Sequence, residues 1–343
     1  MRITFAPWGE TLAEMADAAA RAERAGAEVV WAPELHRSAT VSAAALAQAT
    51  SSAQVGTAIA LAFTRSPMVT ALEALDLDEM SGGRFLLGLG TGVQRLNEDW
   101  HHARWGKPVT HLAETVRNVR AFWSDACAGD EIDLDGDHEP MRIRGYERPY
   151  PMVRESIPIY LAAMGPAMTR LAGRIADGWI SHELCSPSFL KSRVLPEVET
   201  GLEAAGRERG EIELVVSACC SVDPDPAAAV DRVRGHVGFY ASVRTYADFF
   251  EFHGLGEAQQ RVVGAFRSGA GAEHLAGAVT PEMVDAITLN GDRDRVAEQL
   301  SAYAGLADAV KLSAPTHGLT PAQVRAGQDE VIGLIHTLTG GAQ

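Results

Sequence analysis

Cysteine and positive charge are both scarce in this sequence of 343 residues, and each shortage excludes a class of protein. The four cysteines form no CxxC pair and have no zinc-ligand spacing, so we expect buried, reduced thiols rather than a disulfide framework. Lysine and arginine number 30 against 45 aspartates and glutamates, which leaves a net charge of −15. Because phosphate backbones require a basic face, this balance argues against nucleic acid and anionic membranes as partners.

Long hydrophobic runs and common catalytic motifs are missing as well. The longest apolar run, residues 55–63, is far shorter than a membrane span, and the first residues lack an apolar signal stretch, so we expect a soluble, cytoplasmic protein. There is no GxSxG nucleophile elbow and no Walker sequence. His101 and His102 are adjacent, and neighbours on a helix point in different directions, so we expect no metal site.

The sequence does contain 46% apolar residues, enough for one large core, and we predict a single domain over residues 1–343. Short β-type runs alternate with amphipathic helices, which is typical of parallel βα units. Strands are predicted at residues 2–6, 28–31, 55–63, 84–89, 157–162, 179–181, 213–219 and 308–313. Helices are predicted at residues 11–25, 41–50, 67–80, 112–123, 166–176, 187–205, 293–303 and 321–338.

Two segments interrupt this alternation. Residues 125–155 are polar, and 131–144 resemble a small surface hairpin, whereas residues 224–278 are too long for a plain crossover and indicate a helical insertion. Eight strand-helix alternations predict the α/β class and a single (β/α)₈ TIM barrel with insertions. An open doubly wound sheet fits the pattern less well.

In such barrels the functional residues lie on the loops that follow the strands. The fourth strand ends in Gly88-Leu89-Gly90-Thr91-Gly92, a GxGxG spacing that is not the GxGxxG of a dinucleotide fold. These glycines allow backbone N–H groups to approach a ligand, or they simply pack a tight turn. The fifth strand ends before Pro166, which suits the first turn of a helix whose N–H groups can bind an anion, or which merely starts there.

The second strand is followed by Glu34 and His36, which place a carboxylate and an imidazole near the same end of the predicted barrel. Either side chain can exchange a proton with a ligand. A solvated glutamate and a surface histidine are the alternative interpretation of the pair.

Taken together, these segments resemble the luciferase-like monooxygenase superfamily, in particular its branch that uses the deazaflavin coenzyme F420. The similarity to methylene-tetrahydromethanopterin reductases is carried by six stretches: 22–31, GTAIALAFTRSP at 56–67, LDLDEMSGGRFLLGLGTG at 75–92, 95–98, IPIYLAAMGPAMTRLAGRIADG at 157–178, and 290–312.

The resemblance implies specific cofactor contacts. It places a non-prolyl cis peptide bond between Ala58 and Ile59, against the back of the deazaflavin ring, and Glu34 at the pyrimidine side of that ring. The remaining residues that it implies near the cofactor or its phosphate and side chain are Thr91, Gly92, Asn97, Ala163, Met164, Gly165, Pro166 and His182.

The sequence departs from the sugar-phosphate dehydrogenases of this branch at two positions. Those enzymes have a histidine directly after the acidic residue and a glutamate directly after GTG, whereas this chain has Leu35 and Val93 there. Their acid-base pair is therefore not reproduced, which argues against a sugar-phosphate substrate.

The leading hypothesis is hydride transfer between C5 of coenzyme F420 and a small organic substrate, an alkene, imine or alcohol/carbonyl compound. Glu34 or His36 would exchange the proton, with His182 and Glu98 as further candidates. We expect a homodimer, and the aromatic residues of the 224–278 segment form either a lid or an oligomer contact. An FMN-dependent monooxygenase and a non-catalytic flavin-binding barrel, or a subunit of a complex, are the alternatives.

Overall fold

The computed structural model describes residues 1–269 and 271–340. The chain forms two compact units. Unit 1 comprises Met1–Glu28, Ser181–Pro196 and Leu214–Gln343, and unit 2 comprises Val29–Ile180 and Glu197–Glu213. Both contain parallel strands connected through helices, which is the α/β class expected from the alternation in the sequence.

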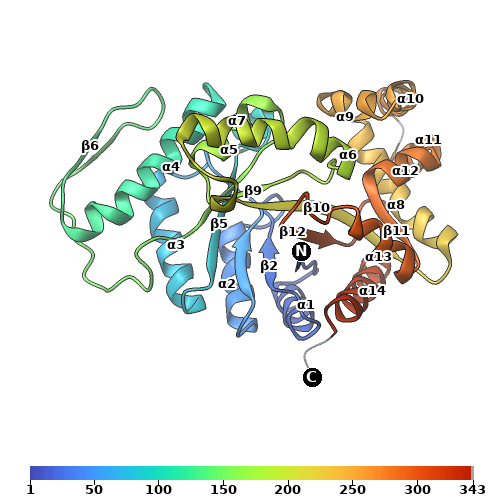
Figure 1. The fold of residues 1–343 in the computed structure, drawn as a ribbon, viewed down its shortest axis with the longest axis horizontal. Coiled ribbons are helices and arrows are strands. Elements are labelled where there is room, and N and C mark those ends of the chain that lie inside the picture. Colours follow the sequence, from blue (N-terminus) through green and yellow to red (C-terminus); the bar gives the residue numbers. More distant parts are fainter. Residues whose placement is uncertain (270, 341–343) are drawn as a thin grey trace. The chain divides into compact units, whose positions relative to one another are not determined.

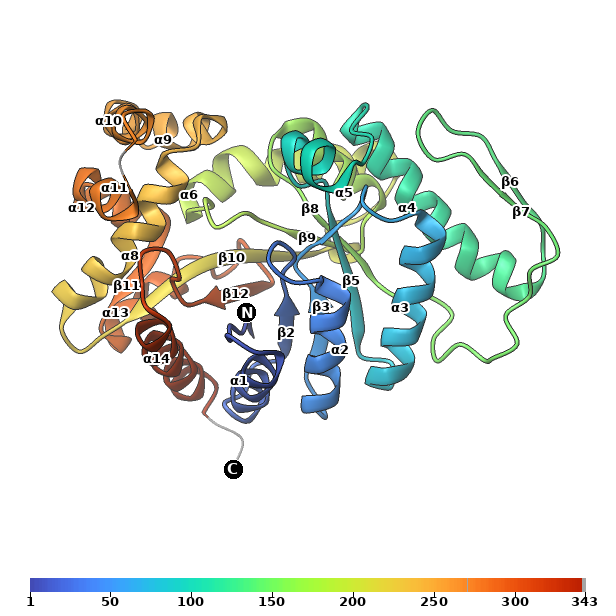
Figure 2. The ribbon, with the colours of Figure 1, turned by 180° about the vertical axis from the view of Figure 1, so that it is seen from behind.

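The sheet of unit 2 has five parallel strands, in the order β2 (Val29–Ala32), β3 (Gln54–Thr57), β5 (Phe85–Gly90), β8 (Ile159–Ala162) and β9 (Gly178–Ile180). Its main helices are α2 (Ala39–Ala49), α3 (Pro67–Ser81), α4 (Pro108–Ser124) and α5 (Pro166–Ile175). Helices α2 and α3 lie side by side (Figure 2). Every residue of β2 and β5 is buried, as expected for parallel strands covered on both faces.

Local signals explain where helix α3 begins and ends. The Ser66 side chain accepts a hydrogen bond from the Val69 backbone N–H at 3.3 Å, and Pro67 occupies the first turn. Gly82 ends the helix in the left-handed conformation with φ of 66°. The predicted helix at 67–80 is therefore confirmed to within one residue at its C-terminal end.

The third predicted strand is interrupted, which corrects the continuous strand expected over residues 55–63. Its first part is β3, and its second part is the short β4 (Ala60–Leu61), which pairs with β5. The peptide bond between Ala58 and Ile59, at the junction of the two parts, is cis.

A small hairpin lies beside α4 in unit 2 (Figure 1). Strands β6 (Ile132–Leu134) and β7 (Met141–Ile143) pair antiparallel, so the hairpin predicted at 131–144 is confirmed. Short helical turns occur before and after it in the chain, at η1 (Leu96–Trp100), η2 (Ala126–Ala128) and η4 (Arg209–Glu211).

The sheet of unit 1 has four parallel strands, in the order β11 (Thr288–Gly291), β10 (Glu213–Val222), β12 (Ala309–Ser313) and β1 (Arg2–Phe5). Strand β11 was not predicted, because four residues that end in glycine are too short to show a period. The accompanying helices are α1 (Leu12–Arg24), α13 (Arg293–Ser301) and α14 (Pro321–Thr339). The helix predicted at 187–205 consists of α6 (Pro187–Phe189), η3 (Leu190–Val194) and α7 (Leu195–Ala205).

The predicted insertion at 224–278 is helical, as expected, although Ala270 lies outside the described residues. It contains α8 (Pro226–Ala241), η5 (Arg244–Tyr246), α9 (Ala247–Phe252), α10 (Gly256–Arg267) and α11 (Ala272–Ala278), and α12 (Pro281–Ile287) follows it. Both views show these helices grouped together (Figures 1 and 2). They share an apolar core that includes Val233, Phe249, Phe250 and Val262.

No helix in residues 1–269 and 271–340 is long and apolar enough to cross a membrane. All four cysteines are free, and Cys185, Cys219 and Cys220 are buried, whereas Cys127 is partly exposed.

Candidate active site

Glu34 is held in unit 2 as an ionised carboxylate. It follows β2 and accepts hydrogen bonds from the Leu61 backbone N–H at 2.7 Å and from both guanidinium NH₂ groups of Arg65, at 2.5 and 3.0 Å. Only 8% of its side chain is exposed. Burial alone would raise the pKa of Glu34, but the hydrogen bonds from Arg65 and Leu61 outweigh it and lower this pKa. The carboxylate therefore fixes the backbone of Leu61, the last residue of β4, and is poorly suited to donating a proton.

The other two acid-base candidates near these strands are on the surface. His36 lies two residues beyond Glu34 and is exposed. Glu98 is also exposed, and its carboxylate accepts hydrogen bonds from the Gln94 side chain at 3.1 and 3.2 Å. Both side chains are accessible to a ligand, unlike the enclosed Glu34.

The segment containing Ala58 and Ile59 packs directly on the end of β5. A Cβ atom on Gly90 would lie 2.8 Å from both Cδ1 and Cγ1 of Ile59, so the missing side chain at position 90 makes room for Ile59. A Cβ atom on Gly92, whose φ is 64°, would lie 2.6 Å from Cδ2 of Leu61. The glycines of GLGTG therefore allow close packing against the two parts of the third strand.

Asn97 organises the loop that follows β5. It is fully buried, and its Nδ2 donates to the backbone carbonyls of Thr91 at 2.7 Å and Val93 at 3.0 Å. Its Oδ1 is buried and has no hydrogen-bond partner among the described residues. Unit 2 thus brings together Glu34, the Ala58–Ile59 segment, Thr91, Gly92 and Asn97 around β4.

The turn before α5 leaves an open helix N-terminus. Ala163 is buried, and its carbonyl accepts a hydrogen bond from the Trp179 indole at 3.2 Å, whereas Met164, Gly165 and Pro166 are exposed. Gly165, with φ of 78°, is the N-cap, and no side chain caps the helix. The N–H groups of the first turn are therefore available to an anion, which was one of the two interpretations that the sequence left open for this position.

His182 belongs to unit 1, where it follows β9 in the chain. Its ring lies 4.7 Å from the Tyr240 ring and 4.8 Å from the Tyr246 ring, and its Nδ1 accepts a hydrogen bond from the Leu184 N–H at 3.2 Å. Burial lowers the pKa of His182 to about 4. The ring is therefore neutral at pH 7 and carries its proton on Nε2.

Sequence reasoning missed a polar cluster next to His182. Nε2 of His236 lies 2.8 Å from Oε2 of Glu183, and the Ser313 hydroxyl donates to Oε1 of Glu183 at 2.6 Å. Burial alone would raise the pKa of Glu183, but His236 and Lys311 outweigh it and lower this pKa well below its usual range. The position of Glu183, two residues after a predicted strand end, could have identified it, whereas nothing local marked His236 or Lys311.

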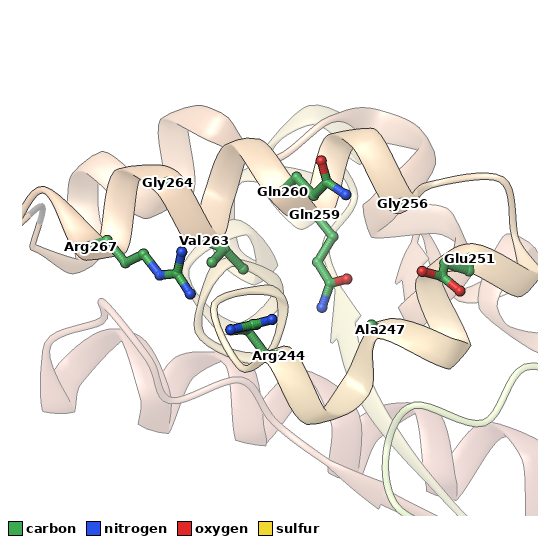
Figure 3. A pocket seen from close by; sticks show the side chains of 9 residues that line it. All are labelled: Arg244, Ala247, Glu251, Gly256, Gln259, Gln260, Val263, Gly264 and Arg267. Atoms are coloured by element: carbon green, nitrogen blue, oxygen red, sulfur yellow. The ribbon is translucent and has the colours of Figure 1, made fainter.

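A groove of the helical segment contains none of the predicted site residues (Figure 3). It has a volume of about 470 Å³ and is lined by residues of η5, α9 and α10, including Arg244, Glu251, Gln259, Gln260 and Arg267. In the part of the chain that the structure describes, no group of three or more His, Cys, Asp or Glu side chains is placed to hold a metal ion.

Residues 3–309 of the chain match the luciferase-like monooxygenase family. An uncharacterized protein of Mycobacterium tuberculosis is 32% identical over 297 residues, which cover 84% of this chain and 86% of that protein. The 5,10-methylenetetrahydromethanopterin reductase of Methanolobus tindarius is 30% identical over 296 residues, which cover 85% of this chain and 86% of the reductase.

Two solved structures resemble nearly the whole chain. The coenzyme F420 dependent tetrahydromethanopterin reductase of Methanopyrus kandleri has a TM-score of 0.81 at 22% identity and covers 98% of both chains. An F420-dependent secondary alcohol dehydrogenase in complex with an F420-acetone adduct has a TM-score of 0.73 at 21% identity and covers 97% of this chain and 98% of its own. These likenesses confirm the (β/α)₈ fold predicted from the strand-helix alternation. The chain therefore belongs to the luciferase-like monooxygenase family and is an oxidoreductase with a (β/α)₈-barrel fold.

Proposed function

We propose that the protein is an F420-dependent oxidoreductase that transfers hydride between C5 of the deazaflavin and a small organic substrate. The observation that carries this proposal is the cluster in unit 2, where the ends of β4 and β5 pack through Gly90 and Gly92. The names of the two solved structures, both F420-dependent enzymes, support the choice of cofactor.

The residues present suit such a cofactor. The Ala58–Ile59 segment would form the wall behind the ring, and the loop of Thr91 and Gly92, tied down by Asn97, would contact its edge. The open N-terminus of α5 suits a phosphate or an acidic side chain of the cofactor. Residues 163–165 precede this helix, and Pro166 is its first residue. When bound, the deazaflavin would supply the hydride donor or acceptor.

Two protein groups near this cluster have distinct proposed roles. Glu34 acts as a positioning residue, because its carboxylate holds the Leu61 backbone and pairs with Arg65. His36 is exposed and is the proposed proton-exchanging group on this side of the site. We propose an alkene, imine or alcohol/carbonyl compound as the substrate, since the relatives named above include reductases and a secondary alcohol dehydrogenase.

The decisive experiment is a titration of the purified protein with coenzyme F420 and with FMN under air. We expect saturable binding of F420, followed by its reduction or oxidation with a member of a panel of small alkenes, imines, alcohols and ketones. Tight FMN binding with oxygen uptake would instead identify a monooxygenase. Binding of either cofactor without turnover across the panel, unchanged by substitution at Ala58 or Ile59, would indicate a non-catalytic barrel.

A further inference from the structure

Unit 1 contains a buried pair of titratable side chains to which no role has been assigned so far. Glu183 follows β9, and His236 lies on α8, and their side chains are 14% and 5% exposed. Oε2 of Glu183 and Nε2 of His236 are 2.8 Å apart. A carboxylate beside an imidazole is the usual arrangement for orienting a histidine that exchanges protons.

The Glu183 carboxylate is fixed from both sides. Its Oε1 accepts the Ser313 hydroxyl at 2.6 Å, which leaves Oε2 facing His236. Ser313 belongs to β12, so a strand of the sheet sets the direction of the carboxylate. Because Glu183 remains ionised, it favours the imidazole tautomer whose proton is on Nε2.

The His236 ring is held in place but retains unused hydrogen-bonding capacity. Its centroid lies 4.8 Å from that of Tyr240 and 5.3 Å from that of His317. Within the described part of the chain, Nδ1 of His236 is buried and has no hydrogen-bond partner. Nε2 lies within ion-pair distance of Glu183, but the two groups are not aligned for a hydrogen bond. Buried polar atoms of folded proteins almost always have partners, so an exception calls for a ligand, a water molecule or a chemical role.

A purely stabilising role does not explain the pair. Taking two ionisable groups out of water costs several kcal/mol, about as much as their attraction returns. A metal is not indicated, because the described residues contain no group of three potential ligands.

We propose that Glu183 and His236 form a second proton-exchange site, at which Nδ1 of His236 gives a proton to, or takes one from, a small ligand bound in unit 1. The matching ligand group is an oxygen or nitrogen that changes protonation, as in an alcohol and a ketone or an amine and an imine. The proton passes between Nδ1 and this heteroatom, while the proton on Nε2 remains toward Glu183. No oxidant or reductant takes part in this step.

The groups around the pair determine its charge. Glu183 interacts electrostatically with Lys311, Tyr240, Tyr246 and Cys219, and His182 and His317 complete the surrounding set. Burial raises the pKa of both tyrosines and of Cys219, and His182 is neutral at pH 7.

The first test uses the full chain labelled with ¹⁵N at histidine, without added cofactor. Long-range ¹H–¹⁵N spectra show which ring nitrogen carries the proton, and the His236 signals are those missing from His236→Gln. We expect the neutral ring to be protonated on Nε2, and the two tautomers to become mixed in Glu183→Gln. A neutral ring protonated on Nδ1, or the same tautomer in wild type and Glu183→Gln, overturns the proposal.

The second test adds acetone and 2-propanol as probes to the same labelled protein. We expect the Nδ1 signal of His236 to shift, with no comparable shift for His253, which pairs with the Ser186 hydroxyl at 2.9 Å and serves as the matched control. Absence of a His236 shift, or equal shifts in both histidines, contradicts the proposal.

The third test is kinetic and rests on the proposed F420-dependent function. His236→Gln, whose amide can still reach Glu183, should lower kcat by about 100-fold or more and remove one limb of the pH profile, with a smaller change in KM. His253→Gln should keep wild-type kinetics. A wild-type pH profile in His236→Gln overturns the inference. Failure of the wild type to bind F420 overturns the proposed function instead, and the two NMR tests then decide whether Glu183 and His236 form a proton-exchange site.

Discussion

Asn97 donates from one amide nitrogen to two carbonyl oxygens of the loop after β5, so this single side chain holds the backbone of Thr91 and Val93. A carboxylate at position 97 cannot donate, and it would bury a charge. We therefore expect Asn97→Asp to lower the free energy of unfolding by about 3 kcal/mol, measured by urea denaturation. It should also weaken F420 binding.

A nearby exposed residue provides the control for this substitution. Glu98→Gln changes a side chain on the same helical turn and should alter the free energy of unfolding by less than about 0.5 kcal/mol. Equal effects of the two substitutions would show that the amide of Asn97 does not hold the loop.

Glu34 makes stability depend on pH. The pKa of Glu34 is lower in the folded protein than in the unfolded chain. Its contribution to the free energy of unfolding is therefore fully present above the unfolded pKa of about 4.3, and it is lost as the pH falls through the pKa of the folded state. We expect the thermal midpoint of the wild type to exceed that of Glu34→Gln by a constant amount above about pH 5, and this difference to shrink at lower pH. A difference that grows on acidification would contradict the assigned ion pair with Arg65.

At the scale of elements, two glycines of β5 control how closely β3 and β4 approach it. A Cβ on Gly88 would lie 1.8 Å from the Thr57 carbonyl oxygen, which is backbone and cannot yield, whereas a Cβ on Gly90 would meet side-chain atoms, those of Ile59 at 2.8 Å and the Cβ of Ala162 at 3.3 Å. We expect Gly88→Ala either to lower the free energy of unfolding by more than about 3 kcal/mol relative to the wild type or to prevent folding. Gly90→Ala should fold, lose about 1 to 3 kcal/mol and bind F420 more weakly.

The matched control is Gly210→Ala, because a Cβ on Gly210 meets no atom within 4 Å. It should leave both the denaturation midpoint and F420 affinity unchanged. If Gly90→Ala behaved like this control, the Ile59 wall would not be part of the cofactor site.

The whole molecule is proposed to be a homodimer, and its surface offers two candidate contacts. Val41 and Val69, on the adjacent helices α2 and α3 of unit 2, are 55% and 43% exposed, and Phe239 and Phe266, on α8 and α10 of unit 1, are 43% and 54% exposed. Association would remove these apolar side chains from water, so each pair of helices is a candidate for the contact of the proposed homodimer.

We expect Val69→Glu to convert the dimer to a monomer in light-scattering chromatography, since a charge in an apolar contact must be desolvated on association. Phe266→Glu should leave the dimer intact. The reverse result would place the contact on the helical segment, and a monomeric wild type would refute the homodimer.

The order of the βα units was determined by the sequence itself, because its signals act over a few residues. The caps of α3, Ser66 and Gly82, the buried run of β5 and the hairpin near 131–144 all follow from local spacing and residue type. These features require no knowledge of distant parts of the chain. The cis bond at Ala58–Ile59 was implied only by the resemblance, and the structure contains it.

The contacts that define chemistry were decided only by the tertiary structure. From the sequence, Glu34 is a candidate for acid-base chemistry. In the structure its carboxylate is fixed, because Arg65, 31 residues later in the chain, binds it. Likewise Glu183, His236 and Ser313 come from three separate elements, so no spacing predicts their meeting. The physical reason is that burial and the partners of a charge set its protonation, and both depend on how the chain folds back on itself.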